Sequence, residues 1–307
     1  MIQAPDAFFD SDLLARLSRL ELAARRVVDG FLAGKNRSSR HGLSVEFVEH
    51  REYAPGDDLR HLDWKVLGRM DRYYIKRYEE ETNITGVLFV DASASMTYGS
   101  GKVTKFETAA TVASALGYML NRQRDAVGLV LHDTDLRVHL QPQIRLASVA
   151  NLVASLHGTT PDGKTAIADL LRQVARELPR RCIFIMLSDF FLPLEEVETA
   201  VQFLHFHGHE AILLQVLDPA ERSFPFDNNT LFKGLEDNRQ LVTEPRRLKE
   251  RYLEILERSI AGVRKVARDC AFDYQLLDSP DGLGQALTAL LARRSQRQRI
   301  VRRGRGS

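Results

Sequence analysis

The stretch that decides the fold is Ile84–Met96, which reads ITGVLFVDASASM. Its first part, Ile84–Val90, is a short apolar run rich in β-formers, which is typical of a strand buried in a parallel sheet. Asp91 is the first polar residue after this run, and two hydroxyl side chains follow at alternate positions, Ser93 and Ser95. Open α/β sheets bind ligands at the carboxyl ends of their strands. A carboxylate and two hydroxyls at such a place favour a hard divalent cation, Mg²⁺ above all.

A motif this short also fits a strand-ending turn in which one of the serines caps the next helix. Two later segments favour the metal site instead. Thr165 opens a helical pattern after the loop Gly158–Lys164, and Asp189 closes a second buried strand, Cys182–Ser188. The sequence therefore predicts five candidate ligands for Mg²⁺, with Mn²⁺ and Ca²⁺ as alternatives: Asp91, Ser93, Ser95, Thr165 and Asp189.

Strand-like and helix-like patterns alternate between residues 84 and 292. This alternation predicts an α/β fold, a doubly wound and mainly parallel sheet with helices on both faces. The expected helices are 104–123, which begins with a capping-box sequence, then 146–156, 166–178, 194–206, 245–270 and 283–291. The further expected strands are 126–131, 136–140 at the sheet edge, 182–187, 211–217 and 272–277. Residues 228–244 are expected to form a hairpin insertion around the turn Asp237–Asn238.

Residues 1–83 are predicted to form a separate, small α+β region, with a helix at 8–32, strands at 42–53 and 73–78, and a short helix between the strands. Charges gather beside Trp64, which suggests an ion-pair network or a docking face for a partner. These candidate docking residues are Arg51, Asp57, Asp58, Arg60 and Asp63. The arginine-rich tail, residues 293–307, is expected to be a disordered extension, with contact to anionic lipid or nucleic acid as the alternatives.

The composition is that of an ordinary globular protein. The chain has 307 residues, 44% of them hydrophobic, and a net charge of +2, so no bulk attraction to nucleic acid or membrane is implied. The two cysteines are expected to be free and buried, which favours a reducing compartment. No apolar stretch approaches the ~20 residues of a membrane span, and the expected location is cytoplasmic. The alternating histidines 205, 207 and 209 are expected at the surface or in a loop.

One segment makes the chain resemble a known family. Residues 44–65 read SVEFVEHREYAPGDDLRHLDWK, which is similar to the signature of the bacterial "domain of unknown function fifty-eight" family. Members carry a von Willebrand factor A-like domain and are typically encoded beside MoxR-type AAA+ ATPases. The five candidate ligands, in their order, resemble the metal-ion-dependent adhesion site of von Willebrand A domains. The resemblance covers nearly the whole chain. It implies a von Willebrand A-like fold for residues 84–292 and a MoxR-type ATPase as partner, in protein assembly or maturation.

A rival motif overlaps the predicted metal site. Residues 158–165 read GTTPDGKT, which matches the P-loop pattern G-x-x-x-x-G-K-T. A P-loop must follow a strand, because the strand aims the N–H groups of the loop at the phosphates. Here the apolar residues before Gly158 recur at spacings of three and four, which predicts a helix. The metal site uses the same Thr165 and also accounts for Asp91, so we favour it.

The favoured function is therefore a non-enzymatic, metal-dependent protein-binding module. The sequence contains no nucleophile elbow, zinc-type histidine pair or dinucleotide fingerprint. Asp133 and Asp135 lie near a strand end and are expected to be turn residues rather than metal neighbours. The alternatives are a nucleotide hydrolase that uses Lys164 and Thr165, and a scaffold whose metal site is vestigial.

Overall fold

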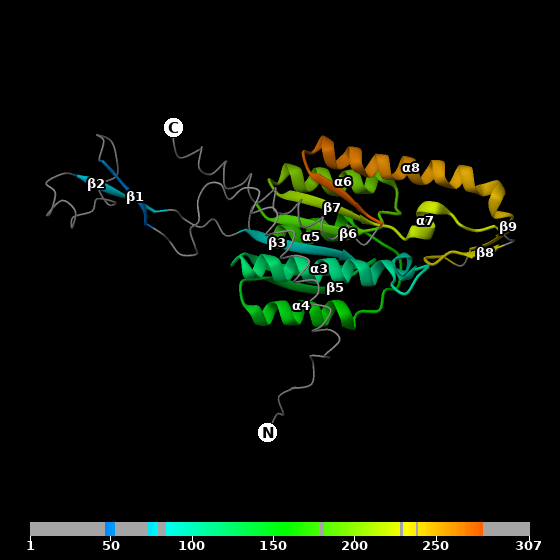
Figure 1. Cartoon of the computed structure of the whole chain (residues 1–307), viewed down its shortest axis with the longest axis horizontal. Coiled ribbons are helices and arrows are strands. Elements are labelled where there is room, and N and C mark those ends of the chain that lie inside the picture. Colours follow the sequence, from blue (N-terminus) through cyan, green and yellow to red (C-terminus); the bar gives the residue numbers. More distant parts are fainter. Residues whose placement is uncertain are drawn as a thin grey trace, which may run out of the picture. The chain divides into compact units, whose positions relative to one another are not determined.

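The computed structural model describes residues 47–52, 73–78, 84–178, 181–227, 230–237 and 239–278 (Figure 1). Trp64, the expected helices at 8–32 and 283–291, the short helix before residue 73 and the basic tail 293–307 lie outside these ranges. So do four of the candidate docking residues, Asp57, Asp58, Arg60 and Asp63. The chain divides into two compact units, one of which is Leu32–Asn83, and each is described here by itself.

The described part of the smaller unit is a two-stranded antiparallel hairpin. Strand β1, Phe47–Glu52, pairs with strand β2, Tyr74–Tyr78, and the backbone of Arg51 lies opposite Ile75. The register shifts once, between Phe47 and Glu49. Both strands lie within the segments in which the sequence predicted them.

The larger unit contains a six-stranded sheet. Its strands are β3 (Thr85–Asp91), β4 (Ala126–His132), β5 (Leu136–Gln143), β6 (Ile183–Ser188), β7 (Glu210–Val216) and β10 (Asp273–Leu277). Their order across the sheet is β10-β7-β6-β3-β4-β5. All neighbours are parallel except β4 and β5, and β5 lies at the edge, as predicted. This order and direction confirm the doubly wound, mainly parallel sheet.

Helices cover both faces of the sheet (Figure 1). Helices α3 (Lys105–Arg122) and α4 (Leu146–Gly158) pack on one face, and α5 (Ala168–Glu177), α6 (Leu194–Phe206) and α8 (Pro245–Asp269) on the other. The shorter elements are the 3₁₀ turn η2 (Ala94–Thr97) and helix α7 (Pro219–Ser223). The expected hairpin insertion is also present, as strands β8 (Thr230–Lys233) and β9 (Gln240–Thr243).

Strand β3 contributes to two separate hydrophobic cores because its side chains alternate between the faces of the sheet. Leu88 and Val90 pack in the core under α3 and α4, whereas Val87 and Phe89 pack in the core under α5 and α6. Gly86 lets α3 approach closely, since a Cβ there would lie 2.6 Å from Leu120. Helix α3 begins with the predicted capping box, in which Thr104 and Glu107 bind each other's backbone N–H groups.

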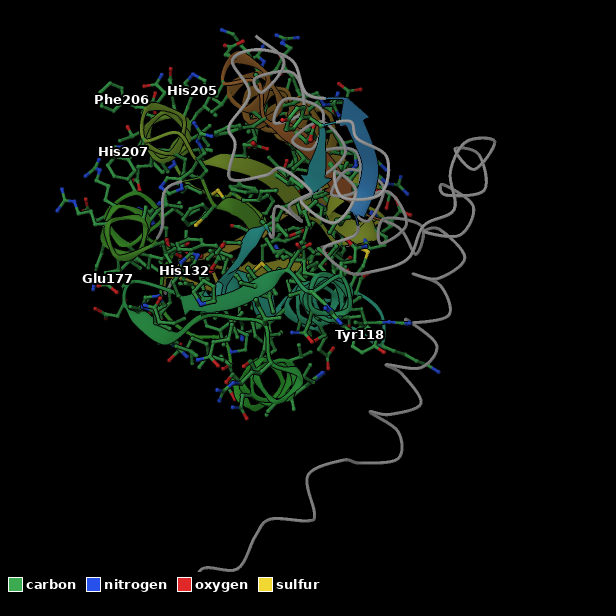
Figure 2. All side chains as sticks on the ribbon, turned by 90° about the vertical axis from the view of Figure 1, so that its left-hand side faces the viewer. Tyr118, His132, Glu177, His205, Phe206 and His207 are labelled. Carbon is green, nitrogen blue, oxygen red and sulfur yellow. The ribbon has the colours of Figure 1, made fainter. Side chains whose placement is uncertain are left out.

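The three histidines were expected at the surface or in a loop, and their exposure differs. His205 and His207 are exposed at the end of α6, as expected, and lie beside the exposed side chain of Phe206 (Figure 2). His209, by contrast, is buried: its Nδ1 accepts a hydrogen bond from the Cys182 N–H at 3.3 Å. Residue 209 lies in the short loop between α6 and β7, and its side chain is buried because it immediately precedes β7. Both cysteines are buried and free, as predicted.

Candidate metal centre

Four of the five candidate ligands lie at the carboxyl ends of β3 and β6, and Thr165 comes from the loop between α4 and α5. Strand β3 lies between β4 and β6, so the chain winds outward from it in both directions. The parallel register pairs Val90 with Leu187, which places Asp91 beside Ser188 at the end of β6. Doubly wound sheets bind ligands at such a switch point, outside the carboxyl ends of the strands. The fold thus places Asp91 where a site is expected.

Asp91 is fully buried, and three groups fix its carboxylate. Its Oδ1 accepts a hydrogen bond from the Ser93 N–H at 2.9 Å. Its Oδ2 accepts hydrogen bonds from the hydroxyls of Thr165 at 3.0 Å and Ser188 at 2.6 Å. Hydrogen bonds to a carboxylate stabilise its charged form and fix its direction. The structure therefore brings Thr165 to Asp91, as predicted. It also adds Ser188, which was expected only as part of the strand.

The two serines after Asp91 face each other. Their Oγ atoms lie 3.1 Å apart, with Ser93 buried and Ser95 half-buried. Ser93 precedes the 3₁₀ turn η2, but its side chain forms no capping hydrogen bond. The alternative prediction, in which a serine of the motif only caps the next element, therefore does not describe Ser93. Its hydroxyl is directed to Ser95 instead.

The loop that carries Thr165 is held in place by backbone hydrogen bonds. The Asp162 N–H donates to the Ala92 carbonyl, and the Ala94 N–H donates to the Gly163 carbonyl, each at 2.9 Å. Gly163 has a φ of +76°, which glycine adopts without steric cost. These contacts bring Thr165 to the carboxylate of Asp91, which lies 74 residues earlier in the chain.

The same loop lacks the architecture of a P-loop. Helix α4 leads into it and ends at Gly158, so a helix stands where a P-loop needs a strand. Lys164 is exposed. Asp133, near the loop, accepts hydrogen bonds from the Asp135 N–H and the Arg137 side chain, which confirms that it is a turn residue.

Asp189, the second acidic candidate, is buried and ion-paired. Its Oδ2 lies 2.7 Å from Lys105 Nζ, and its Oδ1 accepts a hydrogen bond from the Phe191 N–H at 3.0 Å. Lys105 also contacts Glu221 Oε1 at 2.8 Å. Burial lowers the pKa of Lys105, but the attraction of the two carboxylates outweighs it, so the pKa is raised. The side chain therefore remains an ammonium ion inside the centre.

Lys105 and Glu221 were not among the predicted residues of the centre. Lys105 follows the N-cap of α3, a position that normally faces solvent. Glu221 belongs to a capping box with Asp218 that opens α7, directly after β7. The sequence contains this capping box, which places two further acids at the same edge of the sheet as Asp91 and Asp189. Burial is the main cause that raises the pKa of Glu221.

Glu236, also missed, reaches the centre from the β8–β9 hairpin. Burial is the main cause that raises the pKa of its carboxyl group, and repulsion from Asp189 and Asp91 adds to it. Hydrogen bonds from the hydroxyls of Ser95 and Ser93 oppose that rise. The Oε1 atom of Glu236 is buried and has no hydrogen-bond partner among the described residues. The hairpin thus adds a fourth carboxylate, beside Asp91, Asp189 and Glu221.

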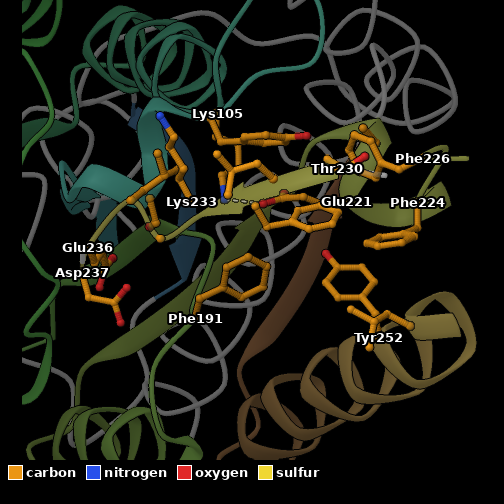
Figure 3. Close-up of a pocket in the computed structure, with 18 residues that line it drawn as sticks. Lys105, Phe191, Glu221, Phe224, Phe226, Thr230, Lys233, Glu236, Asp237 and Tyr252 are labelled. Atoms are coloured by element: carbon orange, nitrogen blue, oxygen red, sulfur yellow. Dashed lines mark hydrogen bonds and ion pairs between the residues drawn. The ribbon is translucent and has the colours of Figure 1, made fainter. Parts of the chain in front are cut away.

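A cavity of about 700 Å³ adjoins the centre (Figure 3). Glu236 and Asp237 lie at one end of it, and the aromatic rings of Phe224, Phe226 and Tyr252 lie at the other. Phe191 stands between them, with its ring 4.7 Å from Lys105 Nζ. The acidic centre therefore opens into an aromatic hollow.

The residues present fit a hard cation. Among the described residues, no group of three or more histidine, cysteine, aspartate or glutamate side chains is arranged to hold a metal ion. A cation here would therefore rest on hydroxyls together with carboxylates, a donor set that suits Mg²⁺ or Mn²⁺ and not a soft metal. The buried, unpartnered Oε1 of Glu236 is the kind of atom that a cation would satisfy.

Comparison with known proteins agrees with this fold. The family described as "Protein of unknown function DUF58" matches residues 49–260. An uncharacterized protein of Mycobacterium tuberculosis H37Rv is 26% identical over 270 residues, which are 85% of this chain and 83% of the relative. Helices that are long and apolar enough to cross a membrane do not occur in the described ranges.

Two solved structures illustrate the likeness. BatB from Bacteroides thetaiotaomicron matches with a TM-score of 0.50 and 16% identity, over 70% of this chain and all of that chain. The von Willebrand A domain of SpRpn10 matches with a TM-score of 0.39 and 11% identity, over 67% of this chain and 94% of that one. The likeness to BatB concerns the fold alone. The doubly wound, mainly parallel sheet predicted from the sequence is confirmed.

Proposed function

Since this chain belongs to the family of proteins of unknown function DUF58, we propose that it is a metal-dependent protein-binding module that does not act as an enzyme. The observation that carries the proposal is the cluster around Asp91, in which a buried carboxylate and the hydroxyls of Ser93, Ser95 and Thr165 meet at the switch point of the sheet. These residues, with Asp189, would hold the cation.

The charge of the centre supports a cation. Four carboxylates gather there: Asp91, Asp189, Glu221 and Glu236. Lys105 is the ammonium group that pairs with two of them. Buried charges are tolerated when they are paired or when they coordinate a metal. A divalent cation would therefore compensate charge that Lys105 leaves unpaired.

The cation would serve as a bridge to the partner. Mg²⁺ prefers six oxygen ligands and keeps water where the protein does not supply them. Three of the candidate ligands are neutral hydroxyls, and Asp91 and Asp189 together only balance the charge of a divalent cation, so the ion can still accept a carboxylate from outside in place of a bound water. A partner with an exposed aspartate or glutamate side chain meets this requirement. The partner that the family resemblance implies is a MoxR-type AAA+ ATPase, and the pair would act in protein assembly or maturation.

The experiment that tests this function measures binding between the full chain and the MoxR-type ATPase of the same organism. Binding is recorded in Mg²⁺, in a chelator, and with the variant Asp91→Asn. We expect binding in Mg²⁺ only, and its loss in the variant. The matched control is Asp135→Asn, because Asp135 is an exposed turn residue. Binding that persists in the chelator and in Asp91→Asn would show that the partner docks elsewhere. The smaller unit, Leu32–Asn83, would then be tested next.

A further inference from the structure

Glu236 differs from every other acid of the centre in its origin. The other acids come from the end of β3 and from the segments that follow β6 and β7. Glu236 comes from the turn of the β8–β9 hairpin, an insertion between α7 and α8 that does not belong to the sheet. Its carboxyl group accepts hydrogen bonds from the hydroxyls of Ser95 and Ser93. Glu236 lies at one end of the cavity (Figure 3).

The hairpin turn is built in a way that fixes the direction of Glu236. The Gly234 N–H donates a hydrogen bond to the Arg239 carbonyl at 2.8 Å, which closes the turn. Asp237 Oδ1 accepts a hydrogen bond from the Arg239 N–H at 3.1 Å. Gly234 leaves room for this arrangement, because a Cβ there would lie 2.0 Å from Asp237 Oδ1. These hydrogen bonds join the two sides of the turn that carries Glu236, and the neighbouring carboxylate, Asp237, is used within the turn itself.

The surroundings of Glu236 give its carboxylate too few favourable contacts. Two other acids, Asp91 and Asp189, repel it, and its Oε1 atom is buried without a hydrogen-bond partner among the described residues. Lys105 is directed to Asp189 and Glu221. A buried acceptor without a partner is destabilising, because it has lost its hydrogen bonds to water. A cation on the serine hydroxyls would supply what this atom lacks.

We propose that Glu236 is itself a ligand of the cation in the resting molecule and holds the coordination position that a partner's carboxylate would take. This inference rests on the proposed function. An incoming carboxylate then competes with Glu236. When the partner binds, Glu236 gives up its coordination position and the cation stays in the centre. Glu236 thus substitutes for the partner's carboxylate. It helps to hold the cation and occupies the coordination position until an acidic partner arrives.

The test measures Mn²⁺ binding to the full chain and the waters on the bound ion. Electron paramagnetic resonance counts free Mn²⁺, and water-proton relaxation reports the water molecules that exchange on bound Mn²⁺. The variant is Glu236→Gln, which keeps the size of the side chain and removes its charge. The matched control is Asp237→Asn, in the same turn. Thermal unfolding of each variant verifies that the fold is retained.

If Glu236 is a ligand, Glu236→Gln weakens Mn²⁺ binding by about tenfold or more. The relaxation enhancement of the remaining bound Mn²⁺ rises, because water takes the vacated position. Acetate, used as a probe carboxylate, then binds the Mn²⁺-loaded variant about tenfold more tightly than the natural chain, since no internal competitor has to leave. Asp237→Asn leaves all three quantities unchanged.

The failures of the two proposals are distinguishable. Mn²⁺ binding that is lost in Asp91→Asn but unchanged in Glu236→Gln overturns the role of Glu236 and leaves the metal centre standing. Acetate affinity that is unchanged or lower in Glu236→Gln also overturns the competition. If the natural chain binds no Mn²⁺ at all, the metal centre and the role of Glu236 are both wrong.

Discussion

Lys105 Nζ lies 2.7 Å from Asp189 Oδ2, and the side chains are 2% and 0% exposed. A buried ion pair of this kind is costly to break from one side, because the remaining charge is left without compensation. The same Lys105 contacts Glu221 at 2.8 Å, so one ammonium ion joins α3 to the loop after β6 and to α7. The predicted ligand Asp189 is thus already engaged by a cation that the chain itself supplies.

Removal of this ammonium ion has a clear expected effect. Lys105→Met keeps the aliphatic stem but leaves Asp189 and Glu221 buried without their partner. We expect the free energy of unfolding to fall by about 3 kcal/mol or more. Because the centre then carries more uncompensated negative charge, Mg²⁺ is expected to raise the melting temperature of the variant by more than that of the natural chain.

The control for this prediction is Lys102→Met, since Lys102 is exposed. Denaturant titrations in chelator and in Mg²⁺ measure both quantities for the two variants. Equal stability of Lys105→Met and Lys102→Met would contradict the importance of the buried pair.

Thr165 offers a test of the hydroxyl ligands that does not remove a charge. Thr165→Val deletes the Oγ1 atom that donates to Asp91 at 3.0 Å and preserves the shape of the side chain. We expect Mg²⁺ or Mn²⁺ affinity to fall by about tenfold and the free energy of unfolding by only about 1 kcal/mol. Isothermal titration calorimetry measures the affinity. Thr160→Val, in the same loop but exposed, should change neither.

Nucleotide binding is expected to be absent. Helix α4 ends at Gly158, so the N–H groups of the following loop are not aimed by a strand, and Lys164 is exposed. Equilibrium dialysis with ATP and Mg²⁺ should therefore detect no binding to the isolated chain, and Lys164→Ala should behave like the natural chain. Micromolar ATP binding that is lost in Lys164→Ala would reinstate the P-loop interpretation.

His132 predicts a pH dependence of stability. It is 1% exposed, its ring lies 4.2 Å from that of Phe89, and burial lowers its pKa below the usual 6.5 although Asp91 and Asp133 oppose this. Above pH 6.5 the side chain is neutral in the folded and unfolded states. Below it the unfolded chain binds the proton more readily, so stability is lost as the pH falls from 6.5 toward the folded pKa.

The matched measurement uses His132→Phe, which keeps a ring against Phe89. Urea unfolding at pH 7.5 and 5.5 in chelator should show a smaller loss of stability on acidification for this variant than for the natural chain. The slope attributable to one histidine is at most about 1.4 kcal/mol per pH unit. His205→Phe, at an exposed histidine, should retain the full pH dependence. An unchanged pH dependence in His132→Phe would show that His132 is not responsible.

Much of the fold was predictable because its signals are local. The apolar runs that became β3 and β6 are continuous, and the capping box at Thr104 fixes the start of α3 within the chain itself. The link between Asp91 and Thr165 was predictable for another reason: both follow from strand and helix ends that a parallel sheet brings to one edge.

The parts of the centre that were missed depend on contacts far apart in sequence. Lys105 meets Glu221 across 116 residues, and nothing near Lys105 distinguishes it from a solvated lysine at a helix start. Glu236 was recognised only as part of a hairpin insertion, because its meaning depends on where that hairpin lies on the folded sheet. The burial of His209 was missed for a similar reason, since it depends on the packing of the strand that follows it.

Strand β5 has a consequence for association with other chains. As the edge strand, it presents one row of backbone groups that no strand of the sheet pairs, and such rows invite further strands and aggregation. Pro142 lacks an N–H to offer, and Arg137 and Gln141 are exposed along the strand. Proline and charge at an edge discourage the addition of another strand. Association by sheet extension is thus disfavoured at this edge, which leaves recognition to side chains and charge rather than to the backbone.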